Sequence, residues 1–327
     1  MKTRPAYILS TGSYLPEKVL ENSYFEKIVD TSDEWIQERT GIQRRHMVAD
    51  HESTATLATE AARKALEQAR LTPNDIDLIV VGTASPERNF PSTACFVQQM
   101  LGATKAMPCF DLTAACSGFH YAASVATQFV RSGQYRNVLA IGAETLTRIM
   151  NWQDRGSCIL FGDGAGAAVV SADSGHEILY CDLFADGSKG ELITRRLGSR
   201  YPATPENLAA GHQFISLEGR EVYKVVVNKL PETVLDCLKN NGYSLSDLTW
   251  ILPHQMNQRI IEASAKRLEL PLEKFLMNIQ DTGNTSSASV PILMDQRNRD
   301  GTLKKGDLVC IVVFGGGFTW GSMLVRW

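Results

Sequence analysis

Short, uninterrupted runs of apolar residues recur along this chain and constrain its fold more than any other feature. Longer segments, in which apolar side chains return at helical spacing, separate these runs. Runs of about four to seven apolar residues predict strands buried on both faces of a sheet, and the segments between them predict helices that cover it. The chain is therefore expected to have an α/β fold.

The two halves of the chain repeat one order of predicted elements, which indicates an internal duplication. The first half spans 1–175 and the second spans 176–327. No linker rich in Pro, Gly or Ser separates them, so we expect the halves to pack closely. The predicted helices are 53–69, 92–101, 116–131, 220–238 (interrupted or kinked at Pro231), 257–268 and 285–297. The predicted strands are 77–83, 108–112, 137–142, 165–171, 249–252, 274–278, 307–314 and 319–325.

The charge balance argues against two classes of partner. The 33 basic and 36 acidic residues leave a formal net charge of −3, so no global positive field would hold nucleic acid or an anionic membrane. The most apolar windows, 164–170 and 308–314, are far shorter than the roughly 20 residues that a membrane-spanning helix needs. We therefore expect neither nucleic-acid nor membrane binding.

The cysteines indicate a reducing compartment. The chain has 7 of them, widely spread and with no Cys-x-x-Cys pair, so the pattern predicts neither a disulfide framework nor a zinc site. The N-terminal segment has no secretory apolar region. We expect a cytoplasmic protein with no metal.

Residues that follow the carboxyl ends of predicted strands are the first candidates for a site, because ligands of parallel sheets bind at that edge. This criterion selects the turns 113–118, 252–255 and 282–285. Two of these turns are counterparts if a pseudo-twofold axis relates the halves. Cys116 and Asn284 would then face each other, with His254 alongside.

Each of these three residues also has an ordinary structural interpretation. Cys116 begins a predicted helix, where unpaired N–H groups and the helix dipole stabilise a thiolate, but a cysteine among alanines also packs in cores. His254 follows Pro253 at a strand end and could be a satisfied core histidine, and Asn284 could simply cap a helix.

The combination of Cys, His and Asn is more informative than any one of them. Carbon–carbon bond formation between thioesters needs a soft nucleophile to hold one acyl group and neutral donors to stabilise the enolate of the other. Loss of one such donor typically costs about 3 to 4 kcal/mol. A condensing enzyme fits this set of residues.

Two glycine-rich segments have different interpretations. The segment 161–167 precedes a predicted strand and does not link a strand to a helix, so a dinucleotide-binding loop is disfavoured. The turn 315–317 joins two predicted strands, and its bare backbone could approach a ligand closely. A backbone amide of this turn could serve an oxyanion.

The segments 29–36, 114–119, 161–167, 253–255, 283–286 and 314–321 together resemble β-ketoacyl-acyl-carrier-protein synthase III, and the likeness spans essentially the whole chain. The resemblance implies the thiolase fold, a five-layered αβαβα arrangement of two duplicated halves. It also implies a homodimer that starts bacterial type II fatty acid synthesis.

The resemblance further implies a reaction sequence without metal or nicotinamide. Cys116 would accept a short acyl group, usually acetyl, from acyl-CoA. His254 and Asn284 would hydrogen-bond the thioester carbonyl of malonyl-acyl carrier protein while carbon dioxide departs. The backbone amides of Cys116 and Gly316 would form the oxyanion hole of the acyl-enzyme step.

The resemblance also implies where the substrates bind. It places Trp35 and Arg155 on the CoA adenine, Arg39 and Thr40 nearby, and Asn257 near the pantetheine. Phe90 would reach across the dimer to bound the partner's acyl pocket. A basic patch that docks acidic acyl carrier protein comprises Lys224, Arg259, Lys266 and Arg267.

One residue departs from the family pattern. Arg220 stands where the motif often has Asn against pantetheine, and its extra charge could alter the choice of acyl donor. An enzyme that condenses longer acyl groups, or that acylates another acceptor, is therefore an alternative. The residues also leave open a Cys/His/Asn peptidase and a noncatalytic binding module.

Overall fold

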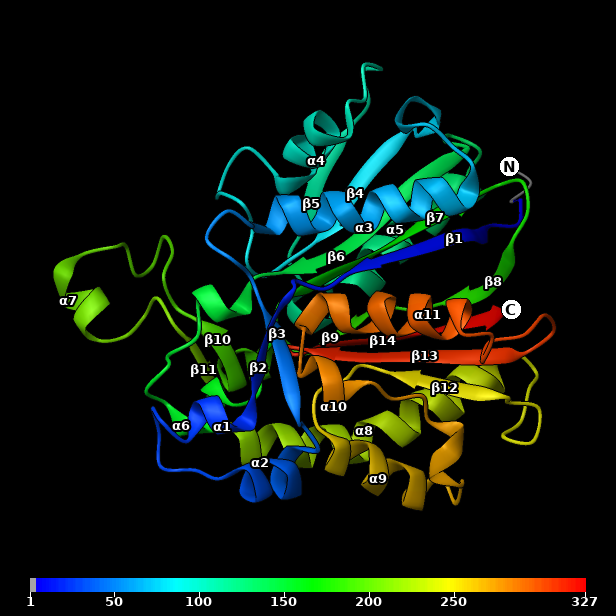
Figure 1. Cartoon of the computed structure of the whole chain (residues 1–327). Coiled ribbons are helices and arrows are strands. Elements are labelled where there is room, and N and C mark those ends of the chain that lie inside the picture. Colours follow the sequence, from blue (N-terminus) through cyan, green and yellow to red (C-terminus); the bar gives the residue numbers. More distant parts are fainter. Residues whose placement is uncertain (1–3) are drawn as a thin grey trace.

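The computed structural model describes residues 4–327 and has an α/β fold built on a large sheet. The strand order along its main path is β12-β13-β14-β8-β1-β7-β6-β4-β5, and β9 pairs with β14 (Figure 1). Its strands are β1 (Tyr7–Tyr14), β4 (Leu78–Gly82), β5 (Cys109–Leu112), β6 (Asn137–Glu144), β7 (Gly164–Ser171), β8 (His176–Cys181), β9 (Phe184–Ala185), β12 (Trp250–Pro253), β13 (Leu308–Gly315) and β14 (Thr319–Arg326).

Strand order and direction repeat in the two parts of this sheet. In the first part, β4 runs parallel to β5 and β6, whereas β6–β7 and β7–β1 are antiparallel. In the second part, β12 runs parallel to β13, β13–β14 and β14–β8 are antiparallel, and a single parallel bridge joins Ile251 to Phe275. The antiparallel pair β1–β8 connects the parts. This repeat is what an internal duplication would produce, and the division at residue 175 stays a prediction.

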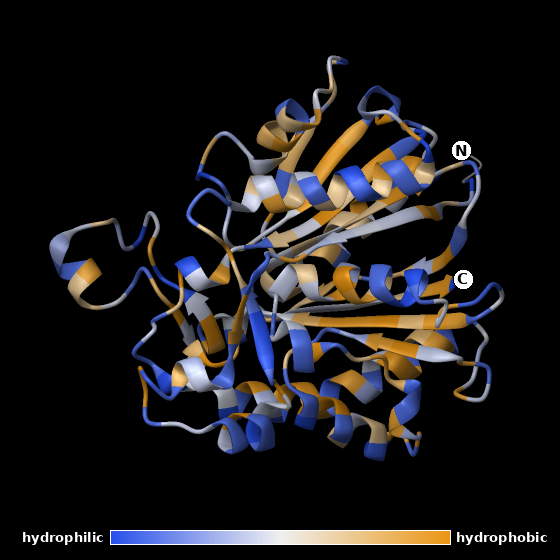
Figure 2. Cartoon of the chain, viewed as in Figure 1, coloured by the Kyte–Doolittle hydropathy of each residue, from blue (hydrophilic) through white to orange (hydrophobic). Residues whose placement is uncertain are grey.

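Helices and sheet strands form five layers (Figure 1). α3 (Thr54–Ala69) and α4 (Thr93–Leu101) cover the outer face of the first part, and α8 (Gly219–Asn240) and α9 (Gln258–Arg267) cover that of the second. Between the parts lie α5 (Gly118–Arg131) and α11 (Ser289–Arg299). Most residues of β4, β5 and β13 are hydrophobic, whereas hydrophilic and hydrophobic residues alternate along α3 and α9 (Figure 2).

Small residues let the outer helix α3 lie close to the sheet. Ala61 and Ala65 are fully buried, and a Cβ added to Gly12 of β1 would lie 2.3 Å from the Ala61 carbonyl oxygen. Only glycine fits at that point of the strand. The Ser53 side chain accepts a hydrogen bond from the Thr56 backbone N–H, and the Thr56 hydroxyl is bonded to the Ser53 backbone, so a capping box starts the helix.

The remaining elements are short. Two small sheets comprise β2 (Lys18–Glu21) with β3 (Arg44–Met47) and β10 (Ile193–Arg195) with β11 (Ile215–Leu217). The short α-helices are α1 (Asn22–Phe25), α2 (Asp33–Thr40), α6 (Arg155–Cys158), α7 (Pro205–Ala209) and α10 (Ile279–Thr282). The 3₁₀ helices are η1 (Pro73–Asp75), η2 (Ala115–Ser117), η3 (Leu146–Arg148), η4 (Gly187–Leu192), η5 (Leu272–Lys274) and η6 (Ser286–Ala288).

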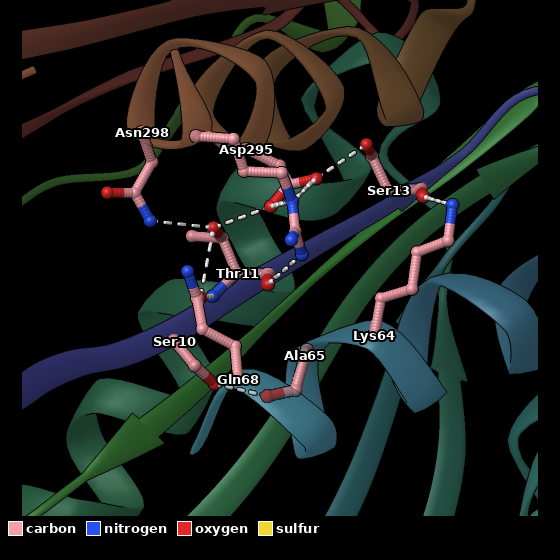
Figure 3. Close-up of polar contacts among 9 residues, drawn as sticks. Ser10, Thr11, Ser13, Lys64, Ala65, Gln68, Asp295 and Asn298 are labelled. Carbon is pink, nitrogen blue, oxygen red and sulfur yellow. Dashed lines mark hydrogen bonds and ion pairs between the residues drawn. The ribbon is translucent and has the colours of Figure 1, made fainter. Parts of the chain in front are cut away.

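A buried carboxylate ties the second half to the first (Figure 3). Asp295 of α11 is 1% exposed and accepts hydrogen bonds from Thr11 Oγ1 at 2.8 Å and Ser13 Oγ at 2.7 Å, both on β1. Arg299 Nε donates to it at 2.9 Å. Because donors surround the carboxylate, its burial does not leave an unpaired charge.

Three predictions about the elements need correction. The predicted strand 274–278 is wrong, because Phe275 makes one bridge after a 3₁₀ turn. The buried strands of the first half are not all parallel, since β7 runs against β6, whereas the antiparallel pair β13–β14 fits the predicted turn 315–317. The helix α8 continues through Pro231, where the buried face that includes Leu230 and Val234 outweighs the lost hydrogen bond.

None of the helices between residues 4 and 327 is both long enough and apolar enough to cross a membrane.

Candidate active site

Cys116 lies in a tight turn between a strand and a central helix. The chain leaves β5, forms η2 and continues as α5. Ala115 adopts φ +44°, a left-handed conformation that is uncommon for a residue with a side chain. Ser286 adopts φ +49° at the matching turn before α11. The two halves therefore present the same strained turn at the centre of the molecule.

The turn between β13 and β14 packs directly against Cys116. A Cβ on Gly315 would lie 2.9 Å from the Cys116 backbone nitrogen and 2.8 Å from that of Ser117. A Cβ on Gly316 would lie 3.5 Å from the Ala115 Cβ. Glycine is required at 315 because the two backbones nearly touch there, whereas the closest neighbour of a Cβ on Gly316 would be the Ile193 carbonyl oxygen at 2.9 Å.

His254 projects from the end of β12 and is held at both its backbone and its side chain. Its backbone N–H donates to the Val312 carbonyl at 2.9 Å, and its ring Nδ1 lies 2.6 Å from Ser289 Oγ. The side chain is 2% exposed, and this burial lowers the imidazole pKa to about 3. The imidazole is therefore neutral near pH 7 and suits a donor without charge.

Asn284 is fixed through its backbone and through one end of its amide. Its backbone N–H donates to the Leu160 carbonyl at 2.9 Å, and its carbonyl accepts from the Gly162 N–H at 3.1 Å. Its Oδ1 accepts from the Ser286 backbone N–H at 2.8 Å. This bond spans two residues and forms an Asx-turn, and it is not a helix cap, because η6 is capped at Thr285 and α11 at Ala288. Within residues 4–327 the Nδ2 donors have no protein acceptor.

One cavity of about 890 Å³ brings most of the predicted site residues together. Its deep lining includes His254 and Asn284, which are buried, and Cys116, which keeps partial exposure. Its lining also includes the half-buried Trp35 and three exposed arginines, which are Arg39, Arg155 and Arg220. The predicted residues that line the cavity are Trp35, Arg39, Thr40, Cys116, Arg155, Arg220, His254, Asn257 and Asn284.

The other predicted residues lie outside this lining. Gly315, and not Gly316, faces the cavity. Phe90 is 84% exposed on a different loop. The predicted docking residues are exposed on the neighbouring helices α8 and α9, and they are Lys224, Arg259, Lys266 and Arg267.

Trp35 forms the centre of a cationic entrance. The guanidinium carbon of Arg155 lies 5.0 Å from the Trp35 ring centroid, and that of Arg39 lies 5.9 Å away. Asn257 Nδ2 donates to the Arg39 carbonyl at 3.0 Å, while its Oδ1 caps α9. An aromatic face between two guanidinium groups suits a planar, anionic ligand.

Burial has the largest effect on the pKa of the Cys116 thiol. Loss of hydration raises the thiol pKa to about 12; the nearby charge of Glu144 also raises it, and the Ser286 hydroxyl lowers it. The backbone at the start of the helix lowers the thiol pKa, as predicted, but by less than burial raises it. Desolvation penalises the charged form more than the turn stabilises it.

The sequence interpretation missed three residues that support the site. Glu144 is fully buried and accepts from Ser85 Oγ at 2.6 Å and Ser287 Oγ at 2.8 Å. Ser286 and Ser289 contact Asn284 and His254, respectively. The signal was the run Asn-Thr-Ser-Ser-Ala-Ser at 284–289, which is unusually polar for the start of a buried helix.

Comparison with known proteins decides the family. Residues 110–187 match the model for 3-oxoacyl-[acyl-carrier-protein] synthase III, and residues 238–327 match that for its C-terminal part. The β-ketoacyl-[acyl-carrier-protein] synthase III of Caldanaerobacter subterraneus subsp. tengcongensis is 50% identical, with 98% of each chain covered. That of Xanthomonas campestris pv. campestris (strain ATCC 33913) is 52% identical, again over 98% of each. The chain belongs to the β-ketoacyl-[acyl-carrier-protein] synthase III family.

Solved structures of this synthase family agree along the whole chain. The enzyme of Aquifex aeolicus VF5 has a TM-score of 0.89 at 44% identity and covers 99% of this chain and 100% of its own. That of Thermus thermophilus has a TM-score of 0.91 at 37% identity, covering 98% and 99%. The five layers are therefore those of the predicted thiolase fold. A synthase III is a condensing enzyme, so the peptidase and the noncatalytic module are excluded.

Proposed function

We propose that the protein transfers a short acyl group, first of all acetyl, from acyl-CoA to Cys116 and condenses it with malonyl-acyl carrier protein to start type II fatty acid synthesis. One observation carries this proposal. A single cavity contains Cys116, His254 and Asn284, and the same cavity opens at Trp35 and Arg155. A thioester held at the entrance can thus extend its acyl end to the sulfur.

The first half-reaction is a transthioesterification. The Cys116 sulfur attacks the thioester carbonyl of acyl-CoA, the bond from that carbonyl carbon to the CoA sulfur breaks, and the thiol proton ends on CoA. Backbone amides of Cys116 and Gly316 would hold the transient oxyanion. The turn that carries Gly316 packs against the Cys116 turn at the neighbouring Gly315.

The second half-reaction is a decarboxylative condensation. The bond between the malonyl α-carbon and its carboxylate breaks, and carbon dioxide leaves its electron pair on an enolate. His254 and the Asn284 amide would donate to the enolate oxygen, because both are held rigidly and carry no charge. The enolate carbon then attacks the acyl-Cys carbonyl and releases Cys116, which regains a proton.

Partners outside the cavity belong to the same proposal. The CoA adenine would stack on Trp35, for which the Arg155 guanidinium must move, since it already covers that ring. Acyl carrier protein would dock on the exposed basic residues of α8 and α9. A second copy of the chain would receive the exposed Phe90 beside its acyl pocket. No metal or other cofactor enters the reaction as proposed, and a cytoplasmic location stays a prediction.

A second candidate function has its own support. The priming β-ketosynthase of the R1128 polyketide pathway matches this chain with a TM-score of 0.92 at 33% identity, covering 99% of this chain and 97% of its own. Arg220, which departs from the family pattern, lines the cavity here. A donor other than acetyl-CoA, in a pathway other than fatty acid synthesis, is the alternative that these two observations favour.

Mass spectrometry after exposure to a panel of acyl-CoAs tests the proposal and separates the two candidates. We expect one acyl group per subunit on Cys116, with acetyl loaded fastest, and no loading in Cys116→Ala. In His254→Ala and Asn284→Ala, loading should largely survive while carbon dioxide release collapses. Preferred loading of long or branched groups would favour the second candidate. Intact carbon dioxide release in the His254 and Asn284 variants would overturn the assigned roles.

A further inference from the structure

We propose that Ser289 is a positioning residue that holds His254 in the tautomer protonated on Nε2, so that this ring nitrogen can act only as a donor toward the cavity. The consequence for catalysis rests on the proposed function, because it concerns the decarboxylation step. The tautomer itself does not depend on that function.

The side chains of Ser289 and His254 make a short contact that is shielded from solvent. Ser289 Oγ lies 2.6 Å from His254 Nδ1, and the two residues are 1% and 2% exposed. Ser289 is the first residue of α11, directly behind the turn that carries Asn284. No water is needed to connect the groups, and little room for water exists between them at this distance.

The direction of this hydrogen bond follows from counting protons. Across residues 4–327, Ser289 Oγ has no hydrogen-bond partner other than His254 Nδ1. If Nδ1 carried the ring proton, it would donate to Ser289, and the buried hydroxyl proton would have no acceptor. If the hydroxyl donates to Nδ1, both groups are satisfied. Buried donors are rarely left without a partner, so the hydroxyl is the donor.

The ring proton must then reside on Nε2. A neutral imidazole carries one proton, and an Nδ1 that accepts a bond cannot carry it. His254 also lines the cavity, and Nδ1 is turned toward α11, so Nε2 is the nitrogen that a ligand can meet. His254 is thereby prevented from acting as a base toward Cys116 or substrate in this tautomer.

One short segment therefore prepares both donors. The Ser286 backbone N–H occupies Asn284 Oδ1 and leaves the Nδ2 protons for the cavity. Three residues later, Ser289 occupies His254 Nδ1 and leaves Nε2–H for it. Both groups then present N–H toward an oxygen that gains negative charge, which is the arrangement an oxyanion hole requires.

The first test observes the tautomer in the unmodified enzyme. The full chain is labelled with ¹⁵N-histidine, the His254 signals are assigned from their loss in His254→Gln, and long-range ¹H–¹⁵N correlations are recorded near pH 7. We expect Nδ1 to resonate as an unprotonated nitrogen and Nε2 as a protonated one. A proton on Nδ1 would overturn the proposal, and this test needs no change at Ser289.

The second test separates the two half-reactions. In Ser289→Ala we expect malonyl-acyl carrier protein decarboxylation to fall about tenfold, the order expected for one lost hydrogen bond, while acyl loading on Cys116 stays within about twofold. Ser289→Thr retains the hydroxyl and should restore the rate. The matched control is Ser264→Ala, which removes another fully buried serine hydroxyl, bonded to the Ile260 carbonyl at 2.7 Å.

The outcomes of the second test are distinct. Equal decarboxylation in Ser289→Ala and Ser264→Ala would contradict the role of Ser289 in catalysis. Absence of decarboxylation in the unmodified enzyme would instead refute the proposed function, and the tautomer measurement would still decide the assignment of the ring proton.

Discussion

At the residue scale, the nucleophile is defined by its surroundings more than by its position at a helix start. Cys116 keeps only partial exposure, so most of its hydration is lost, and Glu144 adds a negative charge nearby. The Glu144 carboxylate is fixed by hydrogen bonds from Ala84 and Ser85, which follow β4, and from Ser286 of η6. The free enzyme therefore holds a thiol, and the thiolate forms only transiently or when substrate fills the cavity.

We predict that alkylation of Cys116 by iodoacetamide accelerates steadily with pH and reaches no plateau below about pH 10, because only the thiolate reacts and its pKa lies near 12. Glu144→Gln removes the neighbouring charge and should shift the rise to lower pH by on the order of one unit. Mass spectrometry of the Cys116 peptide measures the rate. Asp163→Asn, which changes another fully buried carboxyl, is the control. A plateau below about pH 8 would contradict the prediction.

At the element scale, short helices at the entrance depend on one another. Asn257 links α2 to α9 through two hydrogen bonds. Its Oδ1 accepts from the Arg259 backbone N–H and caps α9, and its Nδ2 donates to the Arg39 carbonyl of α2. α2 begins at Ser32, whose Oγ accepts from the Trp35 N–H at 3.2 Å. The orientation of Trp35 and Arg39 is thus linked to the start of α9, at the entrance of the cavity.

Two substitutions at this joint should have separable effects. Asn257→Ala removes the cap and the link, and we expect the free energy of unfolding to fall by about 1 kcal/mol and KM for acyl-CoA to rise. Asn257→Asp keeps a capping oxygen but loses the donor to Arg39, so it should raise KM while retaining most of the stability. Urea unfolding and loading kinetics measure the two effects. An unchanged KM in Asn257→Asp would show that the link to α2 is dispensable.

At the scale of the whole molecule, burial in three different parts of the fold keeps three histidines neutral. Burial lowers the pKa of His254 to about 3 and that of His176 to about 4, and it also lowers the pKa of His120. The unfolded chain binds protons at these groups from about pH 6.5 downward, whereas the folded chain does not. The histidines therefore reduce stability as the pH falls through that range.

We predict that replacing His254 removes part of this acid sensitivity. At about pH 5, the difference between the folded and unfolded pKa of His254 costs about 2 kcal/mol of stability. The loss of unfolding free energy between about pH 7 and about pH 5 should be smaller by that amount in His254→Gln. Chemical denaturation at both pH values measures it, and the exposed His51→Gln is the control. Comparison with the unmodified protein cancels the opposite contribution of Glu144 and Asp163, whose pKa values burial raises. Parallel pH curves for His254→Gln and the unmodified protein would refute the prediction.

Much of the fold was predictable because its patterns are local. Apolar runs and helix signals predicted β4, β6 and β13 within about two residues of their bounds, and the repeat of elements predicted two similar halves. The prediction of a strand at 274–278 was wrong, since the apolar residues around Phe275 are buried by a 3₁₀ turn followed by a single bridge. Strand direction was predicted wrongly at β7, because direction depends on how the long connection from β6 returns to the sheet. The short turn 315–317 between two predicted strands already fits the antiparallel pair β13–β14.

The α/β class, the turns that carry Cys116, His254 and Asn284, and the chemistry that those residue types permit could all be inferred from local patterns of residues. Only the tertiary structure decided the protonation of Cys116 and the environment of His254, because both depend on how much water the neighbouring elements exclude. It also decided that Ser289 and Glu144 lie beside these groups. Contacts between residues so distant in the chain follow from the packing of α5 and α11 between the two parts of the sheet, and no local pattern encodes them.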